Sequence, residues 1–272
     1  MSELAVVIGA GADELVAAHT LARAGREVLV IAERDHSFDD AGWVPPPVVR
    51  DLGLSDLRVQ RPDPWIAVPL PGGGRLELWR DLARSAQAIR RLSPRDAANW
   101  PAFCERLSRL ARLFEKLYAA PPPDPLGLGF ALRVRRLGRQ GIEDLLRWPP
   151  MSVADLLDDW FECDALKGAL GAAGVLHLRQ GPRSGGTAFR LLHQHVGSPA
   201  GVFRPPRSNL GQVLAQRPGI EIRRGAAIAR IEVRQGRVSG VTLQSGEEIA
   251  APVVISGADP RRTLLRLIEP GW

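Results

Sequence analysis

The residues with the clearest chemical meaning lie in the first turn of the chain. The apolar run 5–8 passes into Gly9, Ala10 and Gly11, and an amphipathic helical pattern follows. Glycines at this spacing allow a tight turn and a close approach of the backbone to a pyrophosphate. The free amides and the positive dipole end of the following helix then hold the anion. The turn therefore predicts a dinucleotide-binding strand–turn–helix unit.

The same turn departs from the usual Gly-x-Gly-x-x-Gly spacing at its third glycine. Glu14 stands at that position and follows Asp13, so two carboxylates lie at the start of the helix. They could cap the free amides themselves, which contributes roughly 0.5–2 kcal/mol. They would also repel a pyrophosphate, and like-charge contacts of this kind cost several kcal/mol. The turn predicts dinucleotide-binding ancestry and leaves an N-capped helix that binds nothing as the alternative.

The other reactive side chains show no spacing typical of metal binding or nucleophilic catalysis. Cys104 and Cys163 form no CxxC pair, which indicates reduced core residues of a cytosolic protein. His193 and His195 are two positions apart and would point to different faces of a helix. We therefore predict no metal site and name no catalytic residue.

Length and composition are those of a globular protein. The 272 residues, 45% of them hydrophobic, suffice for one large domain or for one domain with an insertion. No apolar run is long enough to span a bilayer, and no basic leader precedes the first strand. We expect a cytoplasmic protein without a secretory signal.

The net charge of +6 is concentrated in one part of the chain. Residues 84–147 hold 13 basic and 6 acidic side chains, and the basic, partly apolar stretch 133–139 lies within them. Such a segment can dock on an anionic membrane surface, although a solvated helix face explains the same pattern and is favoured. Peripheral membrane contact is therefore left open. Nucleic-acid binding is not expected, because no aromatic interleaving or known module is present.

The chain begins and ends with strand patterns and is helical between them. Strands are predicted at 5–8 and 27–32, around a helix at 13–24 that Gly25 ends, and their nearly continuous apolar character indicates a buried parallel sheet. A loop is expected at 36–47, closed by three prolines. From 220 onward, a short strand is predicted at 220–222. Strands at 228–233, 238–243 and 248–250 form an antiparallel meander before a last apolar strand at 252–256.

The middle of the chain carries helical spacing. Ser93 and Pro94 begin a long helix whose apolar stripe recurs every three or four residues, and Ser152 begins another. Trp160 and Phe161 are interpreted as core residues rather than as a cofactor contact. The small residues 168–174 indicate close helix packing or the wall of a cavity.

These elements together predict an α/β protein with an FAD/NAD(P)-binding, Rossmann-like fold. It combines a parallel sheet, an antiparallel meander and a helical insertion between the second and third parallel strands. We assign residues 1–83 and 201–272 to the dinucleotide-binding part and residues 84–200 to the helical insertion, a partial substrate or lid domain.

Three stretches give the sequence a specific resemblance. They are the opening VVIGAGADELVAAHTLARAGREVLVIAERD, the segment PMSVADLLDDWFECDALKGAL at 150–170, and the ending VVISGADPRRTLLRLIEP at 253–270. In these stretches the chain resembles the phytoene-desaturase-like flavoproteins of the FAD-dependent amine oxidase superfamily. The resemblance implies an FAD-dependent oxidoreductase that acts on a lipophilic small molecule, such as a carotenoid precursor.

The resemblance also implies where FAD would touch this chain. The implied cofactor-binding residues are Gly9, Gly11, Ala12, Glu33, Arg34, Ile228, Gly257 and Ala258. Among them, the backbone of Ile228 would contact adenine, and the pair that follows the last strand would line the adenosine end. Ordinary strand and turn packing is the alternative explanation for these positions.

Several positions depart from the family pattern. Ala32 falls where the family places the acid that binds the ribose, and Glu33 could replace it only if the strand end shifts. Residues 38–40 replace a glycine pair, and Ser208 and Asn209 replace another. The family continues for roughly as much sequence again beyond Trp272, and a free-standing version of this chain would lack part of the wall around the flavin ring. A second polypeptide that supplies this part is one hypothesis.

Different classes of function therefore remain open. The chain is either an oxidoreductase with weakened FAD binding that a partner completes, or a non-redox binding or accessory protein that keeps the fold without FAD. A variant of the second hypothesis is a flavin-independent cyclase or isomerase. Its conceivable acid–base residues are Asp155, Asp158, Asp159 and His177. A gene fragment without a stable fold is the last alternative.

Overall fold

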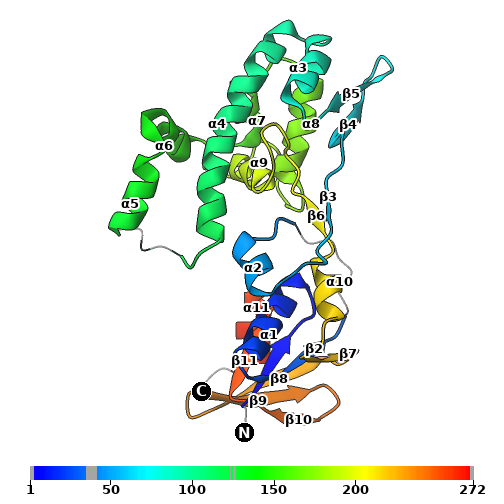
Figure 1. Ribbon diagram of the computed structural model, residues 1–272, viewed down its shortest axis with the longest axis vertical. Coiled ribbons are helices and arrows are strands. Elements are labelled where there is room, and N and C mark those ends of the chain that lie inside the picture. The colour runs from blue at the N-terminus through cyan, green and yellow to red at the C-terminus, as the bar shows by residue number, and fades with distance from the viewer. Residues whose placement is uncertain (1–2, 35–41, 123, 125–126, 270–272) are drawn as a thin grey trace. The chain divides into compact units, whose positions relative to one another are not determined.

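The computed structural model describes residues 3–34, 42–122, 124 and 127–269, and the chain forms two compact units. The first unit comprises residues 1–59 and 207–272, and the second comprises residues 60–206 (Figure 1). This division places 60–83 and 201–206 with the helices, whereas the sequence analysis grouped them with the dinucleotide-binding part. The two-residue strands β3 (Val59–Gln60) and β6 (Arg207–Ser208) pair with each other.

A four-stranded parallel sheet forms the centre of the first unit. Its order is β11-β1-β2-β7. The bounds are β1 (Leu4–Ile8), β2 (Glu27–Ala32), β7 (Glu221–Arg224) and β11 (Val253–Ser256). The register pairs Val7 with Val30 on one side and with Ile255 on the other. The predicted parallel sheet and Rossmann-like fold are confirmed, and the short strand expected near residue 221 is an edge strand of this sheet.

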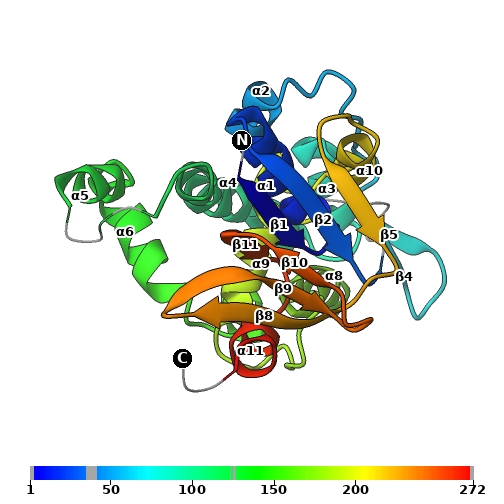
Figure 2. The ribbon, with the colours of Figure 1, turned by 90° about the horizontal axis from the view of Figure 1, so that it is seen from below.

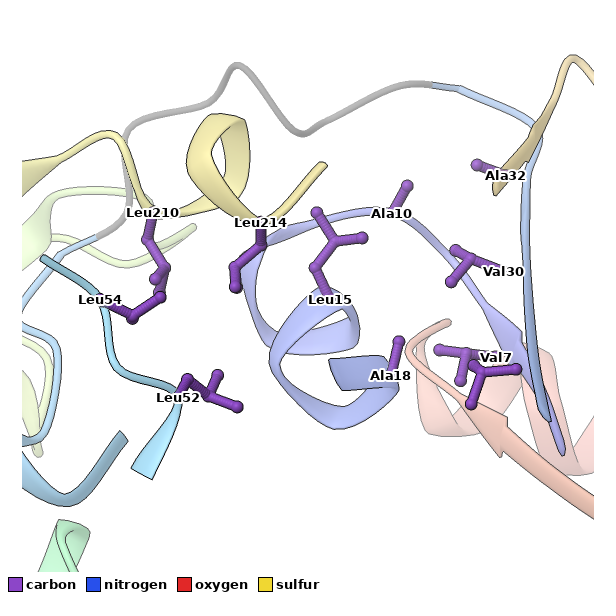
Figure 3. Packing of buried hydrophobic residues seen from close by; sticks show 11 residues of the cluster. Val7, Ala10, Leu15, Ala18, Val30, Ala32, Leu52, Leu54, Leu210 and Leu214 are labelled. Atoms are coloured by element: carbon purple, nitrogen blue, oxygen red, sulfur yellow. The ribbon is translucent and has the colours of Figure 1, made fainter. Parts of the chain in front are cut away.

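The two faces of the sheet pack against different elements, because successive side chains of a strand point to opposite faces. On one face, Val7 and Val30 pack with Leu15 of α1 (Ala12–Arg23) and Leu214 of α10 (Leu210–Ala215), as Figure 3 shows. Gly25, with φ +83°, follows the end of α1 as predicted. This packing fixes the place where α1 begins, directly after β1.

The opposite face of the sheet packs against the predicted meander. Val6 and Ile31 contact Ile231 and Val241 in a second buried cluster. The meander consists of β8 (Ile228–Arg234), β9 (Arg237–Leu243) and β10 (Glu248–Ala250), and its strands are seen beside the sheet in Figure 2. The helical turn α11 (Pro260–Arg262) and the π-helical turn η1 (Thr263–Leu267) follow β11. A short helix, α2 (Pro46–Asp51), begins within the segment expected to be a loop, because Pro46 is well suited to the first position of a helix.

The second unit is mainly helical, as predicted. Its elements are the hairpin β4 (Ile66–Pro69) and β5 (Arg75–Leu78), followed by α3 (Leu82–Arg90), α4 (Pro94–Tyr118), α5 (Leu128–Arg135), α6 (Gly138–Arg147), α7 (Val153–Asp158), α8 (Asp164–Val175) and α9 (Thr187–His195). Its core is aromatic. Phe103 lies 4.9 Å from Phe161 and 5.8 Å from Phe203 between ring centroids, and Phe161 is buried. The interpretation of Phe161 as a core residue is therefore confirmed.

Buried Asp96 joins the start of α4 to the loop between α7 and α8. Its carboxylate accepts hydrogen bonds from the backbone N–H groups of Glu162, at 3.0 Å, and Cys163, at 2.8 Å. The Ser93 hydroxyl accepts a bond from the Asp96 amide and donates one to the Glu162 carboxylate. One acidic side chain thus satisfies two amides in front of α8.

Replacing Asp96 with alanine is expected to destabilise the helical unit strongly. The variant leaves two backbone N–H groups without an acceptor, which costs about 3 kcal/mol and lowers Tm by about 6–12 °C. Thermal unfolding followed by circular dichroism measures the change. Asp164→Ala is the control, because this exposed carboxylate makes only a surface ion pair with Lys167; a loss of under 1 kcal/mol is expected for it. Equal losses of stability in Asp96→Ala and Asp164→Ala would contradict the role of Asp96 as the acceptor for the two buried amides.

Candidate functional site

A cavity of about 510 Å³ lies at the carboxyl ends of β1, β2 and β11. Ligands of open α/β sheets bind outside this edge, and the volume is within the range of small-molecule sites. The lining residues are Ile8, Gly9, Ala10, Gly11, Glu14, Ile31, Glu33, Arg34, Ala226, Ile228, Gly257, Ala258, Arg262 and Leu267. Seven of the eight predicted cofactor residues are in this set, and Ala12 is not.

Two backbone hydrogen bonds bring the turns around this cavity together. The N–H of Gly9 donates to the carbonyl of Ile31 at 2.8 Å, and the N–H of Gly257 donates to the carbonyl of Ile8 at 2.9 Å. Gly9 has a φ of +108°, which favours glycine. The turn after β1 therefore lies between the end of β2 and the turn after β11.

The Glu14 side chain fills the space in front of these glycines. A Cβ atom on Gly11 would lie 2.6 Å from its Oε2, and one on Gly9 would lie 3.1 Å from its Cγ. A Cβ atom on Gly257 would overlap its Oε1. Three glycines from two separate turns thus leave room for one carboxylate.

Glu14 lies in the first turn of α1, and the N-terminal end of such a helix is where dinucleotide-binding folds hold the phosphates. The first intrahelical bond of α1 runs from Leu15 N–H to Gly11 C=O, so the three preceding amides need other partners. Within the described part of the chain, neither Asp13 nor Glu14 has a side-chain hydrogen bond to them. The capping alternative is therefore not realised. The Glu14 carboxylate lies near the positive end of the helix dipole, which favours a negative charge there.

Charged side chains surround the adenosine end of the cavity. Glu33 follows the last residue of β2, and its Oε2 accepts a hydrogen bond from Arg262 Nη2 at 3.2 Å. Ala32, in the position of the family's ribose-binding acid, is 1% exposed and packs in the core. Arg34 also lines the cavity. Glu33 thus reaches the cavity although Ala32 cannot, while an ion pair already engages its carboxylate.

The remaining predicted positions divide into two groups. Ile228 begins β8 and lines the cavity together with Ala258. Ser208 is buried, and the Asn209 amide oxygen accepts a bond from the Arg58 N–H at 2.8 Å. Neither of these two lines the cavity. Residues 38–40 lie outside the described residues. Arg262 also lines the cavity but is not among the residues predicted from the sequence. The sequence indicates only that Arg262 follows the helix start at Asp259 and Pro260.

Two features of the cavity bear on FAD, the cofactor that the resemblance implies. The adenosine end has an open cavity and a carboxylate near its edge, as an adenosine group requires. The Glu14 side chain lies against Gly9, Gly11 and Gly257 and adds a negative charge at the N-terminal end of α1.

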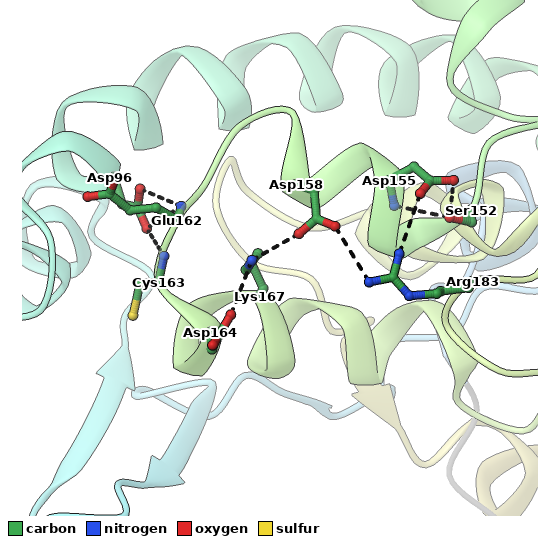
Figure 4. Close-up of polar contacts among 9 residues, drawn as sticks. All are labelled: Asp96, Ser152, Asp155, Asp158, Glu162, Cys163, Asp164, Lys167 and Arg183. Atoms are coloured by element: carbon green, nitrogen blue, oxygen red, sulfur yellow. Dashed lines mark hydrogen bonds and ion pairs between the residues drawn. The ribbon is translucent and has the colours of Figure 1, made fainter.

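Asp155 and Asp158, two of the conceivable acid–base residues, lie beside the basic side chains of Lys167 and Arg183 (Figure 4). Asp158 accepts a hydrogen bond from Lys167 at 2.9 Å, and Arg183 lies 3.8 Å from Asp155 and 3.9 Å from Asp158. The hydrogen bond from Lys167 lowers the pKa of Asp158. A general acid or base works best with a pKa near the operating pH, so a carboxylate with a lowered pKa is unsuited to that role.

The other residues of the cyclase or isomerase variant do not join this group. Asp159 pairs with Arg147 at 2.7 Å. Of the four candidate residues, Asp158 alone lines a cavity of about 320 Å³ between α7 and α8, and His177 lies outside it. The structure thus does not bring the four together.

His195 is a structural residue of the helical core. Its Nδ1 donates to the Val202 carbonyl at 2.7 Å, because a carbonyl can only accept, and its Nε2 accepts from the Ser108 hydroxyl at 2.8 Å. The ring is fully buried and stacks on Phe203 at 4.8 Å. Burial lowers the pKa of His195 from 6.5 to about 4.

No three His, Cys, Asp or Glu side chains of the described residues are placed to hold a metal ion. Among the same residues, the helices are too short or too polar to cross a membrane.

Known proteins resemble this chain along most of its length. No family model matches the sequence. The rat protein named pyridine nucleotide-disulfide oxidoreductase domain-containing protein 2 is 29% identical over 98% of this chain and 55% of its own length. Hydroxyneurosporene desaturase of Rhodobacter capsulatus is 26% identical over 94% of the chain and 56% of its own length. The sequence is related to oxidoreductases of this kind. The predicted resemblance is confirmed, and the chain spans about half the length of these relatives.

Solved structures share the fold. A putrescine oxidase variant matches with a TM-score of 0.60 at 14% identity, covering 100% of this chain and 61% of its own. Cyclohexylamine oxidase from Brevibacterium oxydans matches with a TM-score of 0.55 at 14% identity, covering 100% and 61%. At this identity the likeness supports the amine-oxidase-type fold alone.

Acidification is expected to destabilise the protein through His195. Because its folded-state pKa is lowered, the unfolded state binds more protons between pH 6.5 and about 4, so the free energy of unfolding falls as the pH falls through that window. The loss in the free energy of unfolding reaches about 3 kcal/mol near pH 4. His19 and His193 have lowered pKa values as well and act in the same direction.

Urea unfolding at pH 7 and pH 5 tests this expectation. His195→Gln removes the titrating group. The drop in the free energy of unfolding from pH 7 to pH 5 should therefore be smaller in this variant than in wild type, whatever the stability of the variant at pH 7. His177→Gln, at an exposed position, is the control and should retain the loss. An unchanged pH dependence in His195→Gln would contradict the prediction.

Proposed function

We propose that this chain is a ligand-binding relative of flavin-dependent oxidoreductases whose own affinity for FAD is weak or lost. The observation that carries the proposal is the Glu14 carboxylate packed against Gly9, Gly11 and Gly257. The negative charge of Glu14 would repel the pyrophosphate of FAD. It would also compete with the pyrophosphate for the positive end of the α1 dipole. The chain keeps the fold of its relatives, while the group that holds a dinucleotide in that fold is replaced by its own side chain.

The helical unit supports a lipophilic ligand. The cavity of about 320 Å³ between α7 and α8 is walled mainly by small and apolar residues. They include Val153, Leu157, Gly168, Gly171, Ala172, Val175 and Pro182. Two relatives are named hydroxyneurosporene desaturases. We therefore propose that the ligand is a lipophilic small molecule, received by this cavity with the charges of Lys167 and Asp158 at its edge.

A complete flavin site would need residues outside this sequence. The chain covers 55–56% of the length of the relatives named above, so the rest of their length has no counterpart among these 272 residues. We propose that a second polypeptide supplies it. Co-purification of a partner that brings visible flavin absorption would support this, and a partner complex without flavin would contradict it.

The second candidate is a non-redox binding or accessory protein. The same Glu14 geometry favours it, since a fold that holds its own carboxylate in the phosphate position needs no cofactor there. The absorption spectrum of the purified protein separates the two candidates. Stoichiometric flavin would exclude the second, and no flavin colour with or without partners would favour it.

Replacing Glu14 with glycine is expected to raise the affinity for FAD by about tenfold or more, because the change removes the side chain in front of the three glycines together with its negative charge. Fluorescence titration of free FAD measures the affinity in wild type and variant. The double change Glu14→Gly with Asp13→Asn should bind at least as tightly.

Glu14→Gln is the matched control, since it removes the charge but keeps the bulk. If the affinity of Glu14→Gln for FAD lies between those of wild type and Glu14→Gly, then both the charge and the size of Glu14 weaken FAD binding. If none of the three variants gains affinity, the proposal for Glu14 fails. The weak affinity then arises elsewhere, such as at Ala32, at residues 38–40 or in the part of the relatives' length that this chain does not cover.

Filling the helical cavity is expected to reduce the uptake of an apolar fluorescent probe severalfold. A Cβ atom on Gly168 meets no atom within 4 Å, so Gly168→Leu has room to project into the cavity without straining α8. Gly168→Ala is the control and should retain most of the uptake. Equal uptake by the leucine variant and wild type would remove the support for this cavity as the ligand site.

A further inference from the structure

The helix α5 exposes leucines that are unusual for a solvated surface. Leu128 is 77% exposed and Leu132 is 47% exposed. They are four positions apart, so they lie one above the other on the same face of the helix. In Figure 1, α5 and α6 lie to one side of α4 within the helical unit, and α5 packs against α6. An exposed apolar face of this kind marks a surface that contacts something else.

Arginines continue the same face. Arg135 and Arg136 follow Leu128 by seven and eight positions and thus lie on the stripe that the leucines begin. Arg133 flanks the stripe. These three have no ion-pair partner in the described part of the chain, whereas Arg139 is paired with Glu143 at 3.0 Å. The face therefore combines apolar side chains with uncompensated positive charge.

We propose that this face of α5 docks on an anionic membrane surface. Leucines enter the boundary between headgroups and acyl chains, while arginines bind lipid phosphates or carboxylates and bury their aliphatic stems. A packed protein interface fits less well, because it would desolvate three unpaired guanidinium groups. The contact is peripheral, because α5 has only eight residues.

Sedimentation with vesicles tests the proposal on the full chain. Vesicles of phosphatidylcholine with phosphatidylserine should bind the protein, pure phosphatidylcholine vesicles should bind it weakly, and added salt should release it. Arg135→Gln with Arg136→Gln should weaken binding by about 25-fold, since each arginine near the surface contributes about fivefold. Leu128→Ser with Leu132→Ser should weaken it by about tenfold or more.

A second exposed basic cluster provides the matched control. Arg90 and Arg91 end α3, beside a partly exposed Leu92. Arg90→Gln with Arg91→Gln changes the net charge by the same amount and should leave vesicle binding within about twofold. Circular dichroism should show that all variants stay folded, because every changed side chain is exposed.

Three results would overturn the proposal. One is equal binding to neutral and anionic vesicles, and another is an equal loss in the α3 control. The third is self-association of the wild type that the leucine variant abolishes without vesicles, which would identify a second copy of this chain as the occupant. None of these readouts involves FAD, so their failure is distinct from a failure of the proposed function.

Discussion

The backbone pairing of β1 with β2 and β11 is the interaction on which the site depends. These three strands run parallel, so their carboxyl ends meet at one edge of the sheet. The bonds from Gly9 to Ile31 and from Gly257 to Ile8 continue that pairing into the turns. As a result, glycines almost 250 positions apart in the chain line one cavity. Any ligand of this edge must share it with the side chain that enters from α1.

The side chain that enters from α1 is Glu14, and it brings a negative charge to this edge of the sheet. A helix N-terminus attracts negative charge whether a ligand or the protein provides it. Glu14, at the third position of α1, is close enough for its carboxylate to reach over all three glycines. The end of α1 that suits an anionic ligand therefore also suits the Glu14 carboxylate.

In the helical unit, Asp96 and Asp158 have partners that stabilise the fold. Asp96 satisfies two buried amides, and Asp158 is held by Lys167, with Arg183 nearby. The carboxylates that seemed conceivable for acid–base chemistry thus have stabilising partners. The cavity between α7 and α8 and the exposed face of α5 are the other features of this unit on which the proposals rest.

The sequence alone determined the fold class, because apolar runs, glycine turns and apolar residues at helical spacing are local patterns. Each of them predicts a strand, a turn or a helix without knowledge of distant contacts. It also singled out seven of the residues around the cavity and marked Glu14 as a departure. Only the tertiary structure decided where the Glu14 carboxylate lies, because its neighbour Gly257 comes from the far end of the chain. The ion pair of Glu33 with Arg262 and the burial of His195 needed the structure for the same reason. Contacts between distant segments depend on packing, which no local spacing encodes.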